Sequence, residues 1–177
     1  MGYWNSRGLR GNDFEESINY TNDIYRQKGL GVIQKIPTPI TPVQIQKETG
    51  RISLAYFDSK STVDYIGIIQ GIGVCFDAKE TKAKSLPIRN IHEHQIEFMK
   101  QFKGQGGIAF ILVYFRMFDR YFYMPIDTLL KFWERAKQGG SKSIKLEEFD
   151  ENYEVFCKNG IIVHYIEAVA KDLEKVR

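Results

Sequence analysis

The 177-residue sequence contains few cysteines, little net charge and no long apolar run. Its two cysteines, Cys75 and Cys157, exclude a disulfide framework and a paired-cysteine metal site, so we expect a reducing, cytoplasmic environment. The opening residues MGYWNSRGLRG lack the apolar segment of a secretory signal. No stretch of 18 or more apolar residues occurs, so we expect neither a transmembrane helix nor a membrane partner.

The net charge of +3 is too small to require a polyanionic partner, but it is distributed unevenly. Residues 145–177 carry eight acids and five bases, which leaves 20 bases and 14 acids for residues 1–144. A basic body followed by an acidic tail is compatible with nucleic-acid binding. An ordinary solvated surface gives the same pattern, so charge alone leaves both interpretations open.

The sequence is rich in apolar residues (43%) and aromatic residues (14%), and its length fits one domain over residues 1–177. Apolar periodicity predicts helices at about 14–28, 91–102, 127–137 and 165–176, and strands at 30–36, 107–115 and 120–124. Asn90 and Glu93 have capping-box spacing at the start of the second helix. The aromatic run at 121–124 fits either sheet and dimer core, which we favour, or base stacking. This order predicts an α/β fold with a mixed sheet flanked by helices.

A peripheral segment is expected at about residues 37–57. Three of the five prolines lie in PTPITP (37–42), which disfavours helix and central strand. Residues 43–46 and 52–57 then alternate as in a two-stranded ribbon. Little of the chain is left to cover its apolar side, so the ribbon should project as a lever or a dimer contact.

The stretch STVDYIGIIQGIGVCFDAKETK (61–82) places charged residues inside an otherwise apolar hairpin. A two-residue turn at Gln70 and Gly71 pairs residue i with residue 141 minus i, so Asp64 lies opposite Asp77. Because side chains alternate along a strand, Asp77 and Lys79 share one face. Thr62 should lie on the Asp64 side of the sheet.

The other face of this hairpin is predicted to be core, and the Asp77 face to carry a polar cluster. The residues assigned to the core face are Val63, Tyr65, Ile69, Ile72, Val74, Phe76 and Ala78. A basic loop, KETKAKSLPIRN (79–90), is expected after the hairpin.

Two directly opposed carboxylates repel each other, so a positive charge should lie between them. Mg²⁺ prefers oxygen ligands, keeps several waters and needs only one or two protein carboxylates, which Asp64 and Asp77 supply. Lys79 would then contact a phosphate oxygen or an attacking water. The simpler alternative is that Lys79 only neutralises two exposed acids.

Two helical residues extend this hypothesis. Gln95 lies on the apolar stripe of the helix at 91–102, and a glutamine that faces the sheet needs a polar partner such as a carboxylate or metal site. Glu15 shares a helix face with Asn19 and Asn22, which would let it approach the same site.

With Glu15, Asp64, Asp77-Ala78-Lys79 and Gln95 in this order, the chain resembles the PD-(D/E)xK nucleases, which have the restriction-endonuclease-like fold. The segments KIPTP (35–39), AYFDSKSTVDY (55–65), DAKETK (77–82) and NIHEHQIEFM (90–99) are similar to the RecU Holliday junction resolvases. The similarity runs in order from about Arg7 to Met124.

This resemblance implies a homodimer with a stalk at about 37–57, a Mg²⁺ site with Mn²⁺ as an alternative ion, and a catalytic lysine. The family's metal-site pattern matches Thr62, Asp64, Asp77 and Gln95, its lysine matches Lys79, and further acidic positions match Glu15 and Glu80. The chain departs from the pattern at Val63, which replaces the proline of the wider motif, and at Asp77, which replaces the usual glutamate.

The activity that the resemblance implies is cleavage of four-way DNA junctions by paired phosphodiester hydrolysis in recombination and repair, leaving 5′-phosphate ends. A recombinase or a branch-migration helicase would be a further partner. The alternatives are a duplex-specific nuclease of the same fold and a non-catalytic DNA-binding recombination factor. The candidate DNA contacts are Arg7, Arg10, Lys47, Arg51, Lys82, Lys84 and Arg89.

Overall fold

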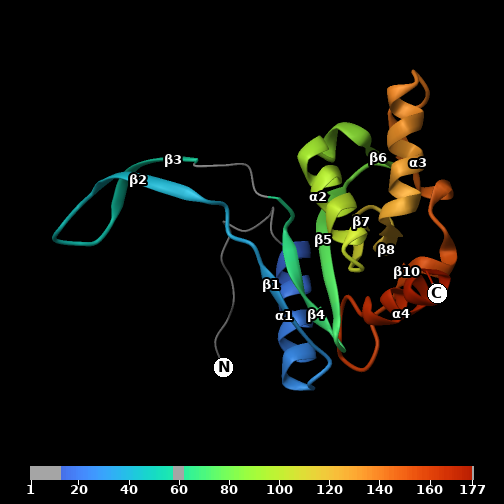
Figure 1. Cartoon of the computed structure of the whole chain (residues 1–177), viewed down its shortest axis with the longest axis horizontal. Coiled ribbons are helices and arrows are strands. Elements are labelled where there is room, and N and C mark those ends of the chain that lie inside the picture. Colours follow the sequence, from blue (N-terminus) through green and yellow to red (C-terminus); the bar gives the residue numbers. More distant parts are fainter. Residues whose placement is uncertain (1–12, 58–61, 177) are drawn as a thin grey trace.

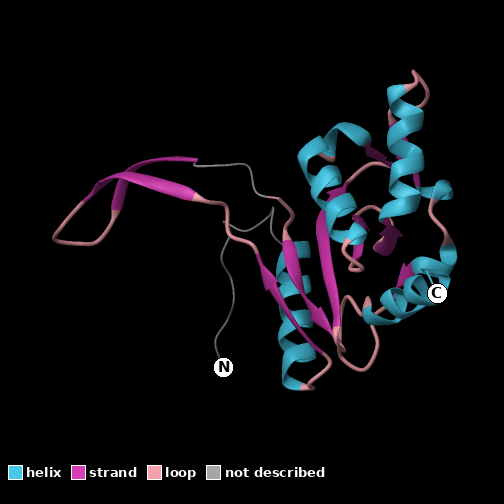
Figure 2. Ribbon diagram, in the orientation of Figure 1, coloured by secondary structure: helices cyan, strands magenta, loops and turns pink. Residues whose placement is uncertain are grey.

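The computed structural model describes residues 13–57 and 62–176, in which a six-stranded mixed sheet forms the centre (Figures 1 and 2). The strand order is β1-β4-β5-β7-β8-β10, and β5 and β7 are parallel while the other neighbours are antiparallel. The strands are β1 (Gly31–Lys35), β4 (Tyr65–Ile69), β5 (Ile72–Thr81), β7 (Ile108–Phe115), β8 (Arg120–Pro125) and β10 (Glu154–Val155). The predicted strands are present, and the α/β class with a mixed sheet is confirmed.

Helices cover both faces of the sheet and divide its core into two layers. They are α1 (Asp13–Gln27), α2 (Glu93–Gly104), α3 (Ile126–Lys137) and α4 (Ile166–Val176). One layer holds Ile18 of α1 and Val169 of α4, and the other holds Met99 of α2 and Leu129 of α3. Strand β7 contributes alternate side chains to both layers, as its continuous apolar run predicts. None of the described helices is long and apolar enough to cross a membrane.

The predicted hairpin register is confirmed. Tyr65 pairs with Phe76 and Ile69 pairs with Ile72, so each pair sums to 141. Gln70 and Gly71 both have positive φ, at 47° and 84°, as a type I′ turn requires. This turn fixes which residues of β4 and β5 face each other.

We predict that Gly71→Ala lowers the free energy of unfolding by about 1 kcal/mol, because an L-residue at this φ is strained. A Cβ at Gly71 would meet no atom within 4 Å, so the effect would come from backbone conformation alone. Urea unfolding measures it. Gly104→Ala is the matched control, since Gly104 also has open space but no positive φ. Equal stability of the two variants would contradict the turn assignment.

The projecting ribbon is present as a separate two-stranded sheet. Strands β2 (Ile40–Ile45) and β3 (Ile52–Phe57) pair with each other and extend away from the body (Figure 1). Their large apolar side chains are exposed: Ile40, Val43, Ile45, Ile52, Leu54 and Tyr56. The ribbon therefore presents an uncovered apolar surface.

Two predictions about residues 79–93 were wrong, and one strand pair was missed. The N-cap of α2 is His92 rather than Asn90, which lies in a short 3-10 helix, η1 (Ile88–Asn90). The expected basic loop is partly ordered, because β5 continues to Thr81 and β6 (Ser85–Pro87) follows. Strand β6 pairs with β9 (Ser143–Lys145), which local periodicity did not predict.

The Asp77 face of the hairpin is also core along most of its length. Cys75 and Ile66, on the same face as Asp77, pack with the α2 and α3 layer, and Val63 joins this layer rather than that of Tyr65. Strict alternation fails at Val63 because this residue precedes β4. Phe122, Tyr123 and Met124 are buried, so the aromatic run there is sheet core.

Candidate active site

Asp64 and Asp77 lie together where β4 begins, as the register predicts. The backbone N–H of Asp64 donates to Asp77 Oδ1 at 2.9 Å, and the backbone N–H of Ala78 donates to Asp64 Oδ2 at 2.9 Å. The Asp77 carboxylate is thus fixed by the backbone of Asp64. The Asp64 carboxylate is fixed by the backbone of Ala78, the neighbour of Asp77.

Lys79 and Gln95 complete this cluster. Lys79 Nζ lies 2.9 Å from Asp77 Oδ2 and donates to Gln95 Oε1 at 3.2 Å. The same Gln95 oxygen accepts from the backbone N–H of His92 at 3.2 Å, which fixes the amide at the start of α2. Gln95 is only 5% exposed, and Lys79 is the polar partner that the sequence predicts for a glutamine facing the sheet.

The electrostatics of the pair favour an added cation. Burial, followed by repulsion from Asp77, raises the pKa of the Asp64 carboxyl above its usual range. Asp77 is fully buried, and its Oδ2 contacts Lys79 without making a hydrogen bond of good geometry. Burial also raises the pKa of the Cys75 thiol to about 12, with Asp77 as the second cause. This region therefore stabilises positive charge and disfavours additional negative charge.

These residues fit a hard divalent cation. Asp77 Oδ2 is a buried carboxylate oxygen without a hydrogen-bond partner, and Asp64 adds a second carboxylate beside it. Within the described ranges, no group of three or more His, Cys, Asp and Glu residues forms a metal site. Two carboxylates with an amide oxygen match Mg²⁺, which keeps much of its water shell, better than a closed zinc site.

Thr62 lies at the start of the second described range, two residues before Asp64, and its side chain is exposed. Its expected role as a metal ligand stays a prediction.

Glu15 lies apart from the aspartate pair in its interactions. Its carboxylate binds Lys35 of β1, and its backbone oxygen accepts from the Tyr65 hydroxyl at 3.3 Å. Because α1 packs on the sheet face that carries Tyr65, Glu15 approaches β4 from the side opposite Asp77.

Glu80 also lies on the other face, since it is adjacent to Lys79 in β5 and side chains alternate. Arg116 Nη2 donates to its carboxylate at 2.8 Å. The structure thus brings together four of the predicted site residues, Asp64, Asp77, Lys79 and Gln95, whereas the carboxylates of Glu15 and Glu80 bind Lys35 and Arg116 instead.

The candidate DNA-contacting cations occupy two regions. Lys47 and Arg51 are exposed near the turn of the ribbon, and Lys82, Lys84 and Arg89 are exposed after β5. Arg7 and Arg10 lie outside the described residues. Sequence reasoning missed the part that His92 plays in holding Gln95, although a glutamine three residues after the cap position was the available signal.

The family model for RecU, recombination protein U, matches residues 9–171. "Holliday junction resolvase RecU" of Lactococcus lactis subsp. lactis is 41% identical, with 93% of this chain and 78% of that protein covered. The protein with the same name from Pediococcus pentosaceus is 38% identical, over 96% and 87% of the two chains. The Bacillus subtilis relative is 42% identical, over 80% and 70%.

Among solved structures, an Archaeoglobus fulgidus Holliday junction resolvase, Hjc, superposes with a TM-score of 0.36 at 12% identity, covering 63% of this chain and 74% of that one. A similarity this distant carries no argument about function. The match of the family model over nearly the whole chain, together with relatives of about 40% identity, is sufficient: this chain belongs to the RecU family.

Proposed function

We propose that this chain is a Mg²⁺-dependent endonuclease that resolves Holliday junctions by paired phosphodiester hydrolysis, with Mn²⁺ as an alternative ion. Residues 1–177 would act as a single nuclease domain with a stalk at 37–57. The single observation that carries the proposal is the cluster of Asp64, Asp77, Lys79 and Gln95 in a chain of the RecU family. A recombinase or branch-migration helicase would be a further partner in the cell.

In this mechanism Asp64 and Asp77, together with Gln95 and Thr62, would hold the cation directly or through water. When bound, Mg²⁺ supplies Lewis-acid polarisation of the phosphate and a water of lowered pKa. The Lys79 ammonium, held by Asp77 and Gln95, would orient the attacking water or stabilise the charge that develops on a phosphate oxygen. The hydrogen bonds from backbone N–H groups keep both carboxylates in place beforehand, so little reorganisation is needed.

A cleavage assay with a synthetic four-way junction and a linear duplex of equal length tests this proposal. We expect cleavage of the junction in Mg²⁺ and in Mn²⁺, loss of cleavage in EDTA, and little cleavage of the duplex. Equal rates on both substrates would favour a duplex-specific nuclease. Junction binding without any cleavage in either metal would favour a non-catalytic recombination factor.

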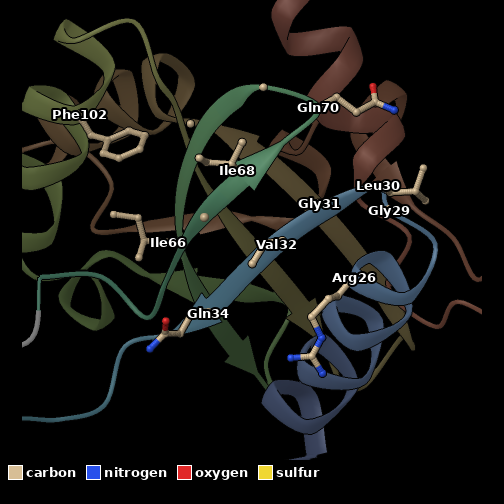
Figure 3. A pocket seen from close by; sticks show the side chains of 13 residues that line it. Arg26, Gly29, Leu30, Gly31, Val32, Gln34, Ile66, Ile68, Gln70 and Phe102 are labelled. Carbon is tan, nitrogen blue, oxygen red and sulfur yellow. The ribbon is translucent and has the colours of Figure 1, made fainter.

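Two symmetric cuts require two sites, which a two-fold homodimer supplies. An uncovered face of β1 and β4 supports such a dimer (Figure 3). Val32 is 64% exposed and Ile68 56% exposed, and these two residues pair across the strands. They line an open groove of about 820 Å³. Since β1 is also an edge strand, we propose that a second copy covers this face.

Replacing Val32 and Ile68 together with lysine should convert a dimer to a monomer, because the interface would then bury charges that have no partner. Sedimentation equilibrium measures the mass. Ile162→Lys is the matched control, since Ile162 is exposed on another part of the molecule and should leave the mass unchanged. A double variant that still sediments as a dimer would place the interface elsewhere.

The stalk cations should contribute phosphate contacts. We predict that Lys47→Ala with Arg51→Ala weakens junction binding and reduces the log–log salt slope by about 0.9 for each lost contact. Titrations at several salt concentrations in EDTA measure the slope. Lys171→Ala, an exposed charge on α4, should not change it. An unchanged slope in the stalk variant would remove Lys47 and Arg51 from the DNA interface.

A further inference from the structure

A second pocket lies between α3 and the β6–β9 pair, apart from the aspartate cluster. Its volume is about 350 Å³, within the range of small-ligand sites. The residues that line it combine an aromatic and apolar surface with three cations: Pro87, Ile88, Arg89, Trp133, Ala136, Lys137 and Lys142. This composition differs from an ordinary core cavity, because three cations and an indole line the same pocket.

The pocket depends on a long-range strand pairing. Leu86 pairs with Ile144, and the backbone N–H of Ile88 donates to Lys142 O at 3.0 Å. This pairing places Lys142 beside Arg89, far away in sequence. Trp133 faces them from α3, where its side chain is half-buried against the α2 and α3 layer.

The charges of the pocket are only partly compensated. Lys137 Nζ lies 5.6 Å from the centre of the Trp133 indole and 3.0 Å from Glu93 Oε1. Among residues 13–57 and 62–176, neither Arg89 nor Lys142 forms an ion pair with an acid. Two uncompensated cations beside an aromatic ring favour an anionic ligand that carries a flat apolar group.

We propose that this pocket binds an unpaired nucleotide of the DNA substrate, with the base stacked on Trp133 and the adjoining phosphates bound by Arg89 and Lys142. Nucleotides combine a flat base with a phosphate, and proteins that bind single strands use aromatic stacking beside cations in this way. The ligand class rests on the proposed function, since it assumes that DNA is the substrate.

The location of the pocket supports this ligand. Arg89 lies in η1, which is separated from α2 by two residues, and α2 carries Gln95, which contacts Lys79. Glu93 of the same helix contacts Lys137 on the wall of the pocket. Because α2 links the pocket to the aspartate cluster, we place the bound nucleotide in the DNA near the cleavage site, and a base that is already unpaired costs least to take out of the stack.

Intrinsic fluorescence tests the proposal directly, because the chain has only two tryptophans, Trp4 and Trp133. In the full chain carrying Trp4→Phe, we expect a 12-nucleotide oligothymidylate in EDTA to quench Trp133 emission in a saturable manner. Fluorescence anisotropy of the labelled oligonucleotide should give about tenfold weaker binding for Trp133→Leu, whereas Trp133→Phe should stay within about threefold of wild type. Lys131→Ala, an exposed lysine of α3 that does not line the pocket, should match wild type.

Binding of the oligonucleotide without quenching of Trp133, or no binding at all, would overturn the proposal. Equal affinity of Trp133→Leu and wild type would also overturn the proposal. The quenching measurement needs no substitution in the pocket, so a folding defect of a pocket variant does not affect it. Junction cleavage by wild type is a separate measurement. Its failure with quenching intact would remove the resolvase assignment and leave the nucleotide site in place.

Discussion

Asp77→Asn should nearly abolish junction cleavage, with a loss of about 10³-fold in rate. A neutral ligand holds the metal ion less well, and the metal ion contributes several kcal/mol to stabilisation of the transition state. The substitution preserves shape, and asparagine Oδ1 can still accept from the Asp64 backbone N–H. Binding of the junction in EDTA should therefore persist. Single-turnover cleavage in saturating Mg²⁺ measures the loss, and thermal unfolding checks that the fold is retained.

The matched control for this prediction is Asp172→Asn. Asp172 is another partly buried carboxylate whose pKa is raised by burial, and it accepts from the Tyr123 hydroxyl at 2.6 Å. It lies outside the aspartate cluster, so its variant should cleave at nearly the wild-type rate. If Asp77→Asn cleaved as well as Asp172→Asn, the active site would have to be elsewhere.

The second large effect is expected at Lys79. Lys79→Met should reduce cleavage by about 10²–10³-fold, the usual result of removing one group that stabilises transition-state charge. It also leaves the buried Asp77 carboxylate without its ion pair, so the metal-free protein should be less stable. Added Mg²⁺ should restore part of that stability, which differential scanning fluorimetry with and without the ion would measure.

Lys79→Arg separates the catalytic role from simple charge neutralisation. Arginine keeps the positive charge and should keep the fold stable, but its larger planar group does not reproduce the position of the ammonium. We expect stability close to wild type with cleavage still strongly reduced. A fully active Lys79→Arg enzyme would support the alternative that this side chain only balances two acids.

Glu80→Gln tests whether the neighbouring acid takes part. Because Glu80 binds Arg116 on the opposite face of β5, its variant should lose less than about tenfold in cleavage while Lys79→Met loses far more. A loss at Glu80 as large as that at Lys79 would show that the role implied by the family resemblance holds despite this separation.

The central cluster was predictable because it depends on local geometry. A two-residue turn at Gln70 and Gly71 fixes the hairpin register, and the period of two then places Asp64 opposite Asp77. The helical period likewise directs Gln95 toward the sheet. Neither inference needs any knowledge of how distant elements pack.

The remaining features depend on packing that local periodicity does not specify. The sequence places Glu15 on one side of its helix, but only tertiary structure decides that α1 covers the sheet face opposite Asp77. It also decides that β6 pairs with β9, which brings Lys142 to Arg89 and Trp133.

The sequence by itself therefore determined the four helices, the longer strands, the hairpin register and the residues that form the acidic and basic centre, because these follow from the spacing of nearby side chains. Tertiary structure decided which helix covers which face, how deeply Asp77 is buried and which remote segments meet. Those outcomes depend on contacts between residues far apart in the chain. These contacts form only when helices pack on both faces of the sheet and bury the two core layers.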